Sequence, residues 1–134
     1  MIIMTKNISR QETRVLILSM DDYGYRQLLR ESLEQNGYRD IRGCTNGNDA
    51  IRLAREYKPH VILMRTKLSN DWETQPENPK THGYVACREI RRQDYGKDIA
   101  IIGMSALGSF YREKWVGAGA DDFVNYPPLK WRAS

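Results

Sequence analysis

Short apolar runs alternate along the chain with longer segments of mixed polarity. Continuous apolar runs lie at about 14–20, 60–65 and 99–104, and weaker ones lie at about 38–44 and 122–124. Apolar runs of this length are typical of parallel strands that are buried on both faces of a sheet. The run at 38–44 is half polar, so we expect it at an edge of that sheet.

The segments between these runs have helical periodicity. Helices are predicted at about 23–36, 47–57, 83–94 and 108–117, and Asn46 can cap the second of them. Strand and helix therefore alternate, and right-handed crossovers place helices on both faces of the sheet. The pattern predicts an α/β fold with a doubly wound sheet of five parallel strands.

The segment 66–82 interrupts the alternation, because it contains two prolines and no hydrophobic period. Loops of this length inside a compact domain are usually functional or disordered. Trp72 lies in this acidic segment and is a candidate anchor for a protein partner. Two alternatives stay open: the ring folds onto the surface of its own domain, or the segment's carboxylates reach Arg65 and close over it as a lid.

Composition limits the class of protein. The chain has 134 residues, of which 40% are hydrophobic and 28% charged, as expected for one globular domain at 14–134 preceded by a tail at 1–13. No apolar stretch is long enough to cross a bilayer, and the start lacks the features of a secretory signal, so we expect a cytoplasmic protein without membrane contact.

The charged residues and motifs argue against several functions. The net charge of +4 is spread over scattered basic residues, so direct contact with nucleic acid is not expected. We find no glycine-rich phosphate loop, nucleophile elbow or zinc signature, and therefore predict no enzymatic activity, no cofactor and no metal.

Polar residues at the ends of the apolar runs form the candidate site. Asp21 and Asp22 follow the first run, Arg65 ends the run at 60–65, and Ser105 follows the run at 99–104. The carboxyl ends of parallel strands meet at one edge of a sheet, where ligands bind in such folds. We therefore expect these four side chains to lie together.

Several motifs occur in a characteristic order between about Arg14 and Pro128. They are Asp21-Asp22 after the first run, Asn36-Gly37-Tyr38, Asn46-Gly47-Asn48-Asp49-Ala50, Lys58-Pro59-His60, Gly103-Met104-Ser105-Ala106 and Ala118-Gly119-Ala120-Asp121-Asp122-Phe123. In this order and spacing the chain resembles the receiver domain of two-component response regulators. The resemblance implies the strand order 2-1-3-4-5. Only six residues follow Pro128, so the last helix is expected to be truncated or absent.

The resemblance also implies roles for the site residues. In that family an acidic pair after the first strand helps to hold magnesium, and an aspartate that ends the third strand accepts a phosphoryl group from a histidine kinase. A Ser or Thr after the fourth strand and a Lys after the fifth bind that group. By position Asp21, Asp22 and Ser105 match, whereas Arg65 replaces the acceptor aspartate and Tyr126 replaces the lysine.

The change to Arg65 has a large physical consequence. A guanidinium has no nucleophilic oxygen, and a fixed cation about 4–5 Å from a divalent ion costs about 7–8 kcal/mol at an effective dielectric constant of about 20. We therefore predict a degenerate pocket that is independent of phosphorylation. Its guanidinium either forks onto Asp21 or Asp22 and locks one conformation, or reaches into solvent while the aspartates cap the next helix.

The expected function is protein–protein contact in a phosphorelay. The partner would be a kinase, an output domain or a second copy in a homodimer, and the candidate contact residues besides Trp72 are Phe110, Tyr111, Trp115 and Trp131. Phe123 occupies the family's switch position, but it lacks a hydroxyl and is expected in the core. Two other functions stay open: a small-ligand or anion sensor, and the regulatory domain of a DNA-binding transcription factor.

Overall fold

A computed structural model describes residues 8–20, 24–106 and 108–125 of the chain. Its five strands are β1 (Arg14–Leu18), β2 (Asp40–Cys44), β3 (Val61–Arg65), β4 (Ala100–Ser105) and β5 (Asp122–Asn125). All neighbouring strands are parallel, and their order in the sheet is β2-β1-β3-β4-β5. The predicted fold and strand order are confirmed, and the half-polar β2 lies at an edge as expected.

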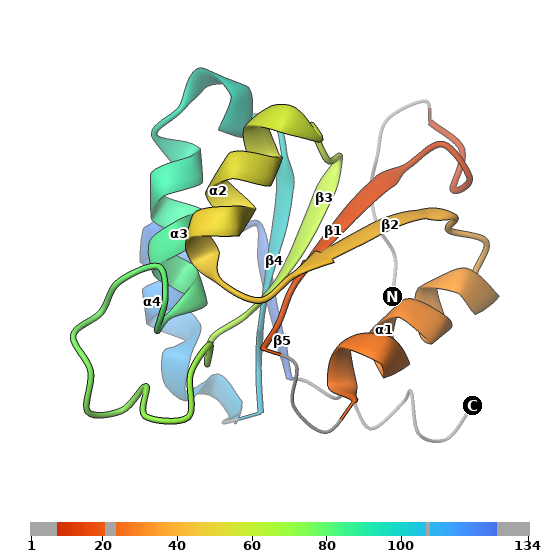
Figure 1. Ribbon diagram of the computed structural model, residues 1–134. Helices are drawn as coiled ribbons and strands as arrows, with labels where there is room; N and C mark the ends of the chain where they lie inside the picture. Colours follow the sequence, from red (N-terminus) through yellow and green to blue (C-terminus); the bar gives the residue numbers. More distant parts are fainter. Residues whose placement is uncertain (1–7, 21–23, 107, 126–134) are drawn as a thin grey trace.

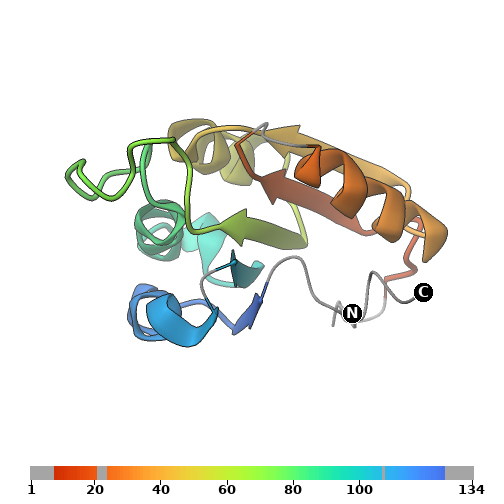
Figure 2. The same ribbon diagram turned by 90° about the horizontal axis from the view of Figure 1, so that it is seen from below.

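Helices cover both faces of this sheet. They are α1 (Tyr25–Gln35), α2 (Gly47–Glu56), α3 (Gly83–Arg91) and α4 (Arg112–Ala118), with short 3-10 turns η1 (Asp94–Gly96) and η2 (Gly108–Tyr111). Helix α1 lies on one face, and α2, α3 and α4 lie on the other (Figure 1). The view from below shows the same two-sided arrangement (Figure 2). The helix predicted at 108–117 begins as a 3-10 turn and becomes α-helical at Arg112.

Local signals in the sequence fix several helix ends. The side chain of Asn46 accepts a hydrogen bond of 3.0 Å from the backbone N–H of Asp49, which caps α2 as predicted. Gly37, just beyond the end of α1, has a φ of +94°, a left-handed conformation that favours glycine. These ends place the following strands in register with β1.

Strands β1 and β3 separate two apolar clusters. Alternate residues of the two strands face α2, α3 and α4, namely Leu16, Leu18, Ile62 and Met64. The residues between them face α1, namely Val15, Ile17, Val61 and Leu63. All eight are fully buried. Because both faces of these strands are packed, their polar chemistry is confined to the carboxyl ends.

Trp115 fixes α4 against the sheet. Its side chain is fully buried, and its Nε1–H donates a hydrogen bond of 2.8 Å to Oγ1 of Thr66, just beyond β3. The ring lies so close to β4 that a Cβ on Gly103 would stand 2.3 Å from Trp115 Cδ2. The glycine in β4 thus makes room for the indole.

Part of the expected N-terminal tail packs on the domain. The backbone N–H of Thr13 donates to the carbonyl of Ser9, which closes a turn just before β1. Arg10 lies over the ring of Tyr38 at 5.7 Å and donates to the carbonyl of Asn36. The division into a tail at 1–13 and a domain from 14 onward stays a prediction.

Tyr126, Trp131 and the expected truncated last helix lie outside the described residues. Among the helices that the structure describes, none is long and apolar enough to cross a membrane.

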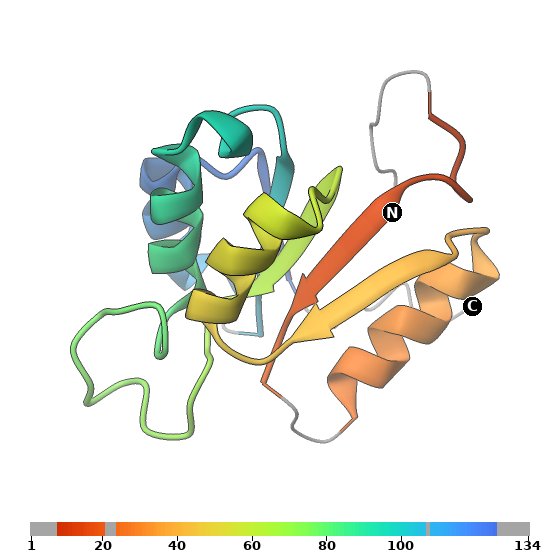
Figure 3. The same ribbon diagram turned by 45° about the horizontal axis from the view of Figure 1, so that its top comes forward.

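The 66–82 segment extends beyond the carboxyl ends of the strands (Figure 3). Its two ends are joined, because Lys67 and His82 form an antiparallel bridge and the N–H of Leu68 donates to the carbonyl of Thr81. In its middle, Trp72 is only 5% exposed. The segment lacks a hydrophobic period but is attached to the domain at its ends, by this indole, and through Glu77 and Pro79, which accept hydrogen bonds from Tyr84 and from the N–H of Gly47.

Candidate functional site

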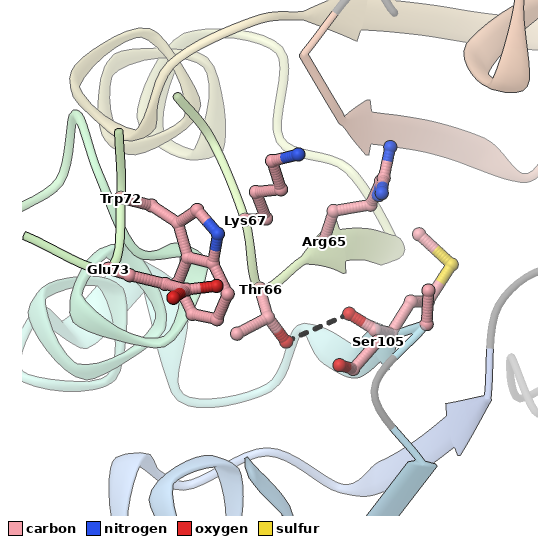
Figure 4. Close-up of a pocket in the computed structure, with 8 residues that line it drawn as sticks. Arg65, Thr66, Lys67, Trp72, Glu73 and Ser105 are labelled. Carbon is pink, nitrogen blue, oxygen red and sulfur yellow. Dashed lines mark hydrogen bonds between the residues drawn. The ribbon is translucent and has the colours of Figure 1, made fainter. Parts of the chain in front are cut away.

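Arg65 and Ser105 meet at the carboxyl edge of the sheet. Arg65 ends β3 and Ser105 ends β4, and the register pairs Arg65 with Met104, next to Ser105. Arg65 is 5% exposed and Ser105 is 3% exposed. Both line one pocket (Figure 4). The structure therefore brings together the two members of the predicted group that it describes.

The end of β1 differs from the expectation. The strand ends at Leu18 instead of residue 20, and Leu18 pairs with Met64, so the next position places Ser19 beside Arg65. The N–H of Ser19 still donates to the carbonyl of Cys44 in β2. Asp21 and Asp22 lie outside the described residues, and their contact with Arg65 stays a prediction.

The guanidinium of Arg65 is held inside the domain. Its Cζ lies 5.3 Å from the ring centre of Tyr25, the first residue of α1, which is within the range of a cation–π interaction. The alternative in which the head of Arg65 reaches into solvent disagrees with its 5% exposure. A positive charge is thus fixed between the end of β3 and the start of α1.

The backbone of Arg65 is equally constrained. A Cβ on Gly83, the first residue of α3, would lie 2.0 Å from the carbonyl oxygen of Arg65. Any residue with a side chain would therefore clash with this peptide. The N–H of Gly83 also donates to the carbonyl of Thr66. Glycine at this position lets α3 start directly against the end of β3.

The pocket beside Arg65 has a volume of about 200 Å³. It is lined by Arg65, Thr66, Lys67, Trp72, Glu73, Met104, Ser105 and Ala106. Trp72 and Glu73 stand on the side of the 66–82 segment (Figure 4). Thr66 and Lys67 were not predicted as site residues, although their places directly after Arg65 in the sequence were a usable signal. The walls carry charges of both signs, with Arg65 and Lys67 cationic and Glu73 anionic.

An aromatic cluster continues from this pocket. The ring of Trp72 lies 5.4 Å from His82 and 5.2 Å from Tyr111, and Tyr84 packs against His82, Tyr111 and the buried Trp115. Trp72 has therefore folded onto the surface of its own domain. This placement gives no support to Trp72 or Trp115 as a partner anchor, and both roles stay predictions.

Phe110 differs from the other predicted contact residues, because it is 79% exposed. It packs only one side of its ring against Tyr111, at 5.0 Å. Phe123 is 7% exposed and lies in the core cluster beneath α4, in keeping with the expected core position. The surface part of the predicted contact set that the structure describes is therefore Phe110 with the half-buried Tyr111.

Protonation states in the cluster follow from burial and one hydrogen bond. The hydroxyl of Tyr84 donates to the carboxylate of Glu77, which lowers the pKa of Glu77. Burial, and then this hydrogen bond, raise the pKa of Tyr84 far above its ordinary value. Burial also lowers the pKa of His82, so this ring is neutral near pH 7.

The two cysteines are not nucleophiles. Cys44 and Cys87 are free and buried, and burial raises the pKa of each thiol to about 12. The reactive form of cysteine is the thiolate, which these values exclude near neutral pH.

Comparison with known proteins decides the family. A family model for the response regulator receiver domain matches residues 15–128, which include all five strands except Arg14, the first residue of β1. The chain belongs to the response regulator receiver domain family. The resemblance inferred from the motifs is therefore confirmed.

Two regulators illustrate the relationship. A DNA-binding dual master transcriptional regulator, RpaA of Synechocystis sp., is 30% identical over 116 residues, which are 85% of this chain and 43% of that protein. The transcriptional regulatory protein AfsQ1 of Streptomyces coelicolor is 32% identical over 114 residues, which are 84% of this chain and 44% of that protein. The chain thus spans less than half the length of these relatives.

Solved structures show the same fold. The receiver domain of the sensor histidine kinase PA1611 from Pseudomonas aeruginosa has a TM-score of 0.69 at 28% identity, with 90% of this chain and 91% of that one covered. The response regulator domain of CheB from Thermotoga maritima has a TM-score of 0.67 at 24% identity, with 90% and 86% covered, and supports the fold alone.

The described part of the pocket does not fit a magnesium ion. The receiver domain of PA1611 was solved with magnesium coordinated in its active site cleft. In this chain β3 ends in a buried guanidinium, and the hydroxyl of Ser19, just beyond the end of β1, donates to the carbonyl of Met20. Magnesium requires oxygen ligands, preferably carboxylates, and a guanidinium offers only donors and a positive charge.

Proposed function

We propose that this receiver domain works without phosphoryl transfer to the end of β3. One observation carries the proposal: Arg65, 5% exposed, is the last residue of β3, where the resemblance places the acceptor aspartate. Arginine cannot form an acyl phosphate, because it lacks a carboxylate. Its charge also opposes the metal that the reaction would need.

Arg65 supplies a permanent positive charge where other receiver domains bind a magnesium ion and a phosphoryl group only for a time. Its guanidinium lies against Tyr25 of α1, and its carbonyl lies against Gly83 of α3. These contacts tie β3 to helices on both faces of the sheet. Breaking a buried ion pair from one side strands the remaining charge, so these contacts, together with the predicted pairing to Asp21 or Asp22, support our proposal that Arg65 holds the domain in one state.

The output of this state is contact with a protein partner in two-component signalling. We propose as partner a kinase, an output domain or a second copy of the chain, and we assign no catalytic activity to the domain. The matched transcriptional regulators are more than twice as long as the matched region. Their names favour a second form of the proposal, in which the chain is the regulatory domain of a DNA-binding transcription factor.

A different class of function has a specific observation in its favour. The pocket of about 200 Å³ is lined by Arg65, Lys67 and Ser105, residue types that can hold a small anion, although the cationic ends of Arg65 and Lys67 point away from Ser105 (Figure 4). Glu73 on the opposite wall opposes a highly charged anion. We therefore rank an anion or small-ligand sensor below protein contact.

Reaction with a small phosphodonor tests the main proposal. The parent protein is incubated with acetyl phosphate and magnesium, and its intact mass is measured. We expect no added phosphate on the parent, and added phosphate on the double variant Arg65→Asp, Tyr126→Lys. Phosphate on the parent would overturn the proposal. Circular dichroism of both proteins shows whether the variant is folded.

A further inference from the structure

A second hollow adjoins the Arg65 pocket on the outer side of the domain. It has a volume of about 520 Å³, within the range of ligand-binding sites, and is lined by Trp72, Glu73, His82, Phe110 and Tyr111. We call it the aromatic groove. It runs between the 66–82 segment and η2.

The walls of the groove are tilted aromatic rings. The planes of Trp72 and Tyr111 meet at 56°, those of Trp72 and His82 at 61°, and those of Phe110 and Tyr111 at 66°. Trp72 and His82 are buried by these contacts, whereas the half-buried Tyr111 and the exposed Phe110 keep ring surface open to the groove. The face of an aromatic ring attracts a cation placed within about 6 Å of its centre.

The rim of the groove carries the negative charge of Glu73. Glu73 is exposed and forms no hydrogen bond or ion pair within the described part of the chain. The neighbouring acid Glu77 differs, because it is engaged by Tyr84 and by Lys114 at 3.1 Å. Burial, and then Glu73 and Glu77, raise the pKa of Tyr111, which places the charge of Glu73 near this ring.

No described residue of the lining carries a competing positive charge near pH 7. His82 is the only titratable base among the lining residues, and burial lowers its pKa, with Lys114 acting in the same direction and Glu77 against it. The groove is therefore anionic and aromatic on a chain whose net charge is +4. General electrostatic attraction would bring anions to this protein, so a cation that binds must do so through local contacts.

We propose that the aromatic groove binds an arginine or lysine side chain of a protein partner, with the cation against the open ring surface of Phe110 and Tyr111 and its charge near Glu73. The inference deepens the proposed function by naming the surface and chemistry of the contact. Phe110 would become buried on binding, since its 79% exposure leaves most of its ring free. An exposed aromatic beside a recess is typical of an interface anchor.

Titration with short peptides tests the groove. The probes are acetylated tetra-arginine amide and, as the opposite charge, acetylated tetra-glutamate amide, and the readout is the amide spectrum of ¹⁵N-labelled protein. We expect the basic peptide to shift the signals of residues 72–73 and 110–111, and the acidic peptide to leave them unchanged. Equal shifts with both peptides, or shifts confined to other regions, would overturn the inference.

Two variants with the same charge change sharpen this test. Glu73→Gln should weaken binding about fivefold, the effect of losing an exposed ion pair of about 1 kcal/mol. Glu34→Gln on α1 is the matched control, because Glu34 is also exposed, and it should bind like the parent. Phe110→Ala should weaken binding as well. Equal affinity of the Glu73→Gln and Glu34→Gln proteins would contradict the role of Glu73.

The titration and the phosphorylation assay fail independently. The titration contains neither phosphodonor nor magnesium. If the parent protein gains phosphate and still binds the basic peptide, the proposed function is wrong and the inference about the groove stands. If the parent protein stays unmodified but does not bind the basic peptide, only the inference about the groove is wrong. Concentration-dependent shifts at 110–111 without peptide would assign the surface to a second copy and contradict the basic partner.

Discussion

The strands and the 66–82 segment are both packed into the domain, but by different means. In β1 and β3 every apolar residue is buried by its neighbours on two faces, and the pattern repeats along each strand. The 66–82 segment has one buried indole, Trp72, hydrogen bonds at its ends, and single polar contacts between them, from Tyr84 to Glu77 and from the N–H of Gly47 to Pro79. Its attachment therefore depends on single residues, whereas the strands share their stability among many.

This difference bears on function, because the segment supplies one wall of the Arg65 pocket and one wall of the aromatic groove. Trp72 and Glu73 line both hollows. A change in the attachment of the segment would alter both sites together, while the carboxyl ends of β3 and β4 would stay fixed. The substitutions below separate the two kinds of packing.

The largest effect is expected at Trp115, which belongs to the strand framework. Replacement by alanine removes a fully buried ring from β4 and α4 and leaves the hydroxyl of Thr66 without its donor. We expect a loss of about 3–5 kcal/mol in the free energy of unfolding, measured by urea denaturation. Phe110→Ala is the matched control and should change it by less than about 0.5 kcal/mol, since this ring is 79% exposed. Equal losses would contradict the assigned packing.

Trp72→Ala should act mainly on the 66–82 segment. The ring is 5% exposed and packs against His82 and Tyr111, so its removal detaches the middle of the segment. We expect a stability loss of about 3 kcal/mol, the low end for a buried aromatic. Hydrogen exchange should accelerate at 66–82 while β1 and β3 stay protected. Uniform acceleration in all strands would show that the segment is part of the framework.

Tyr84→Phe tests the link between the segment and α3. The variant keeps the ring but removes the hydroxyl that donates to Glu77. Hydrogen bonds to charged groups contribute more than neutral ones, and Glu77 is partly exposed, so we expect a loss of about 1 kcal/mol. The pKa of Glu77, followed by carboxyl NMR, should move back up toward its ordinary value. An unchanged pKa would contradict the assigned hydrogen bond.

The pH dependence of stability tests the burial of His82. Its pKa in the folded protein lies below the ordinary value of about 6.5, so on acidification the unfolded chain binds a proton first. Stability is thus fully present above about pH 6.5 and declines as the pH falls through the folded pKa. His82→Gln should flatten this decline between about pH 7 and pH 5. His60, whose pKa is also lowered by burial, accounts for a remaining slope.

The sheet could be predicted because its signals are local and repeated. Continuous apolar runs gave β1, β3 and β4, and Asn46 gave the start of α2. The end of β1 was placed two residues late, because the small polar Ser19 and the apolar Met20 extend the run without extending the strand. A continuous run does not show where pairing ends.

The site was predicted only in part. The position of Arg65 followed from the end of an apolar run, but its contact with Tyr25 depends on how α1 packs across the sheet. The folding of Trp72 onto Tyr111 joins segments that are far apart in the chain and carry no shared pattern. Such contacts arise from three-dimensional packing, so the sequence could suggest Trp72 as functional but could not place its ring.

Magnesium binding tests most directly the claim that a cation at the end of β3 has replaced the metal-dependent chemistry. The parent protein is titrated with magnesium in a calorimeter without phosphodonor. The buried guanidinium of Arg65 predicts no saturable binding at millimolar magnesium. Saturable binding to the parent that disappears in Asp21→Asn would contradict the account.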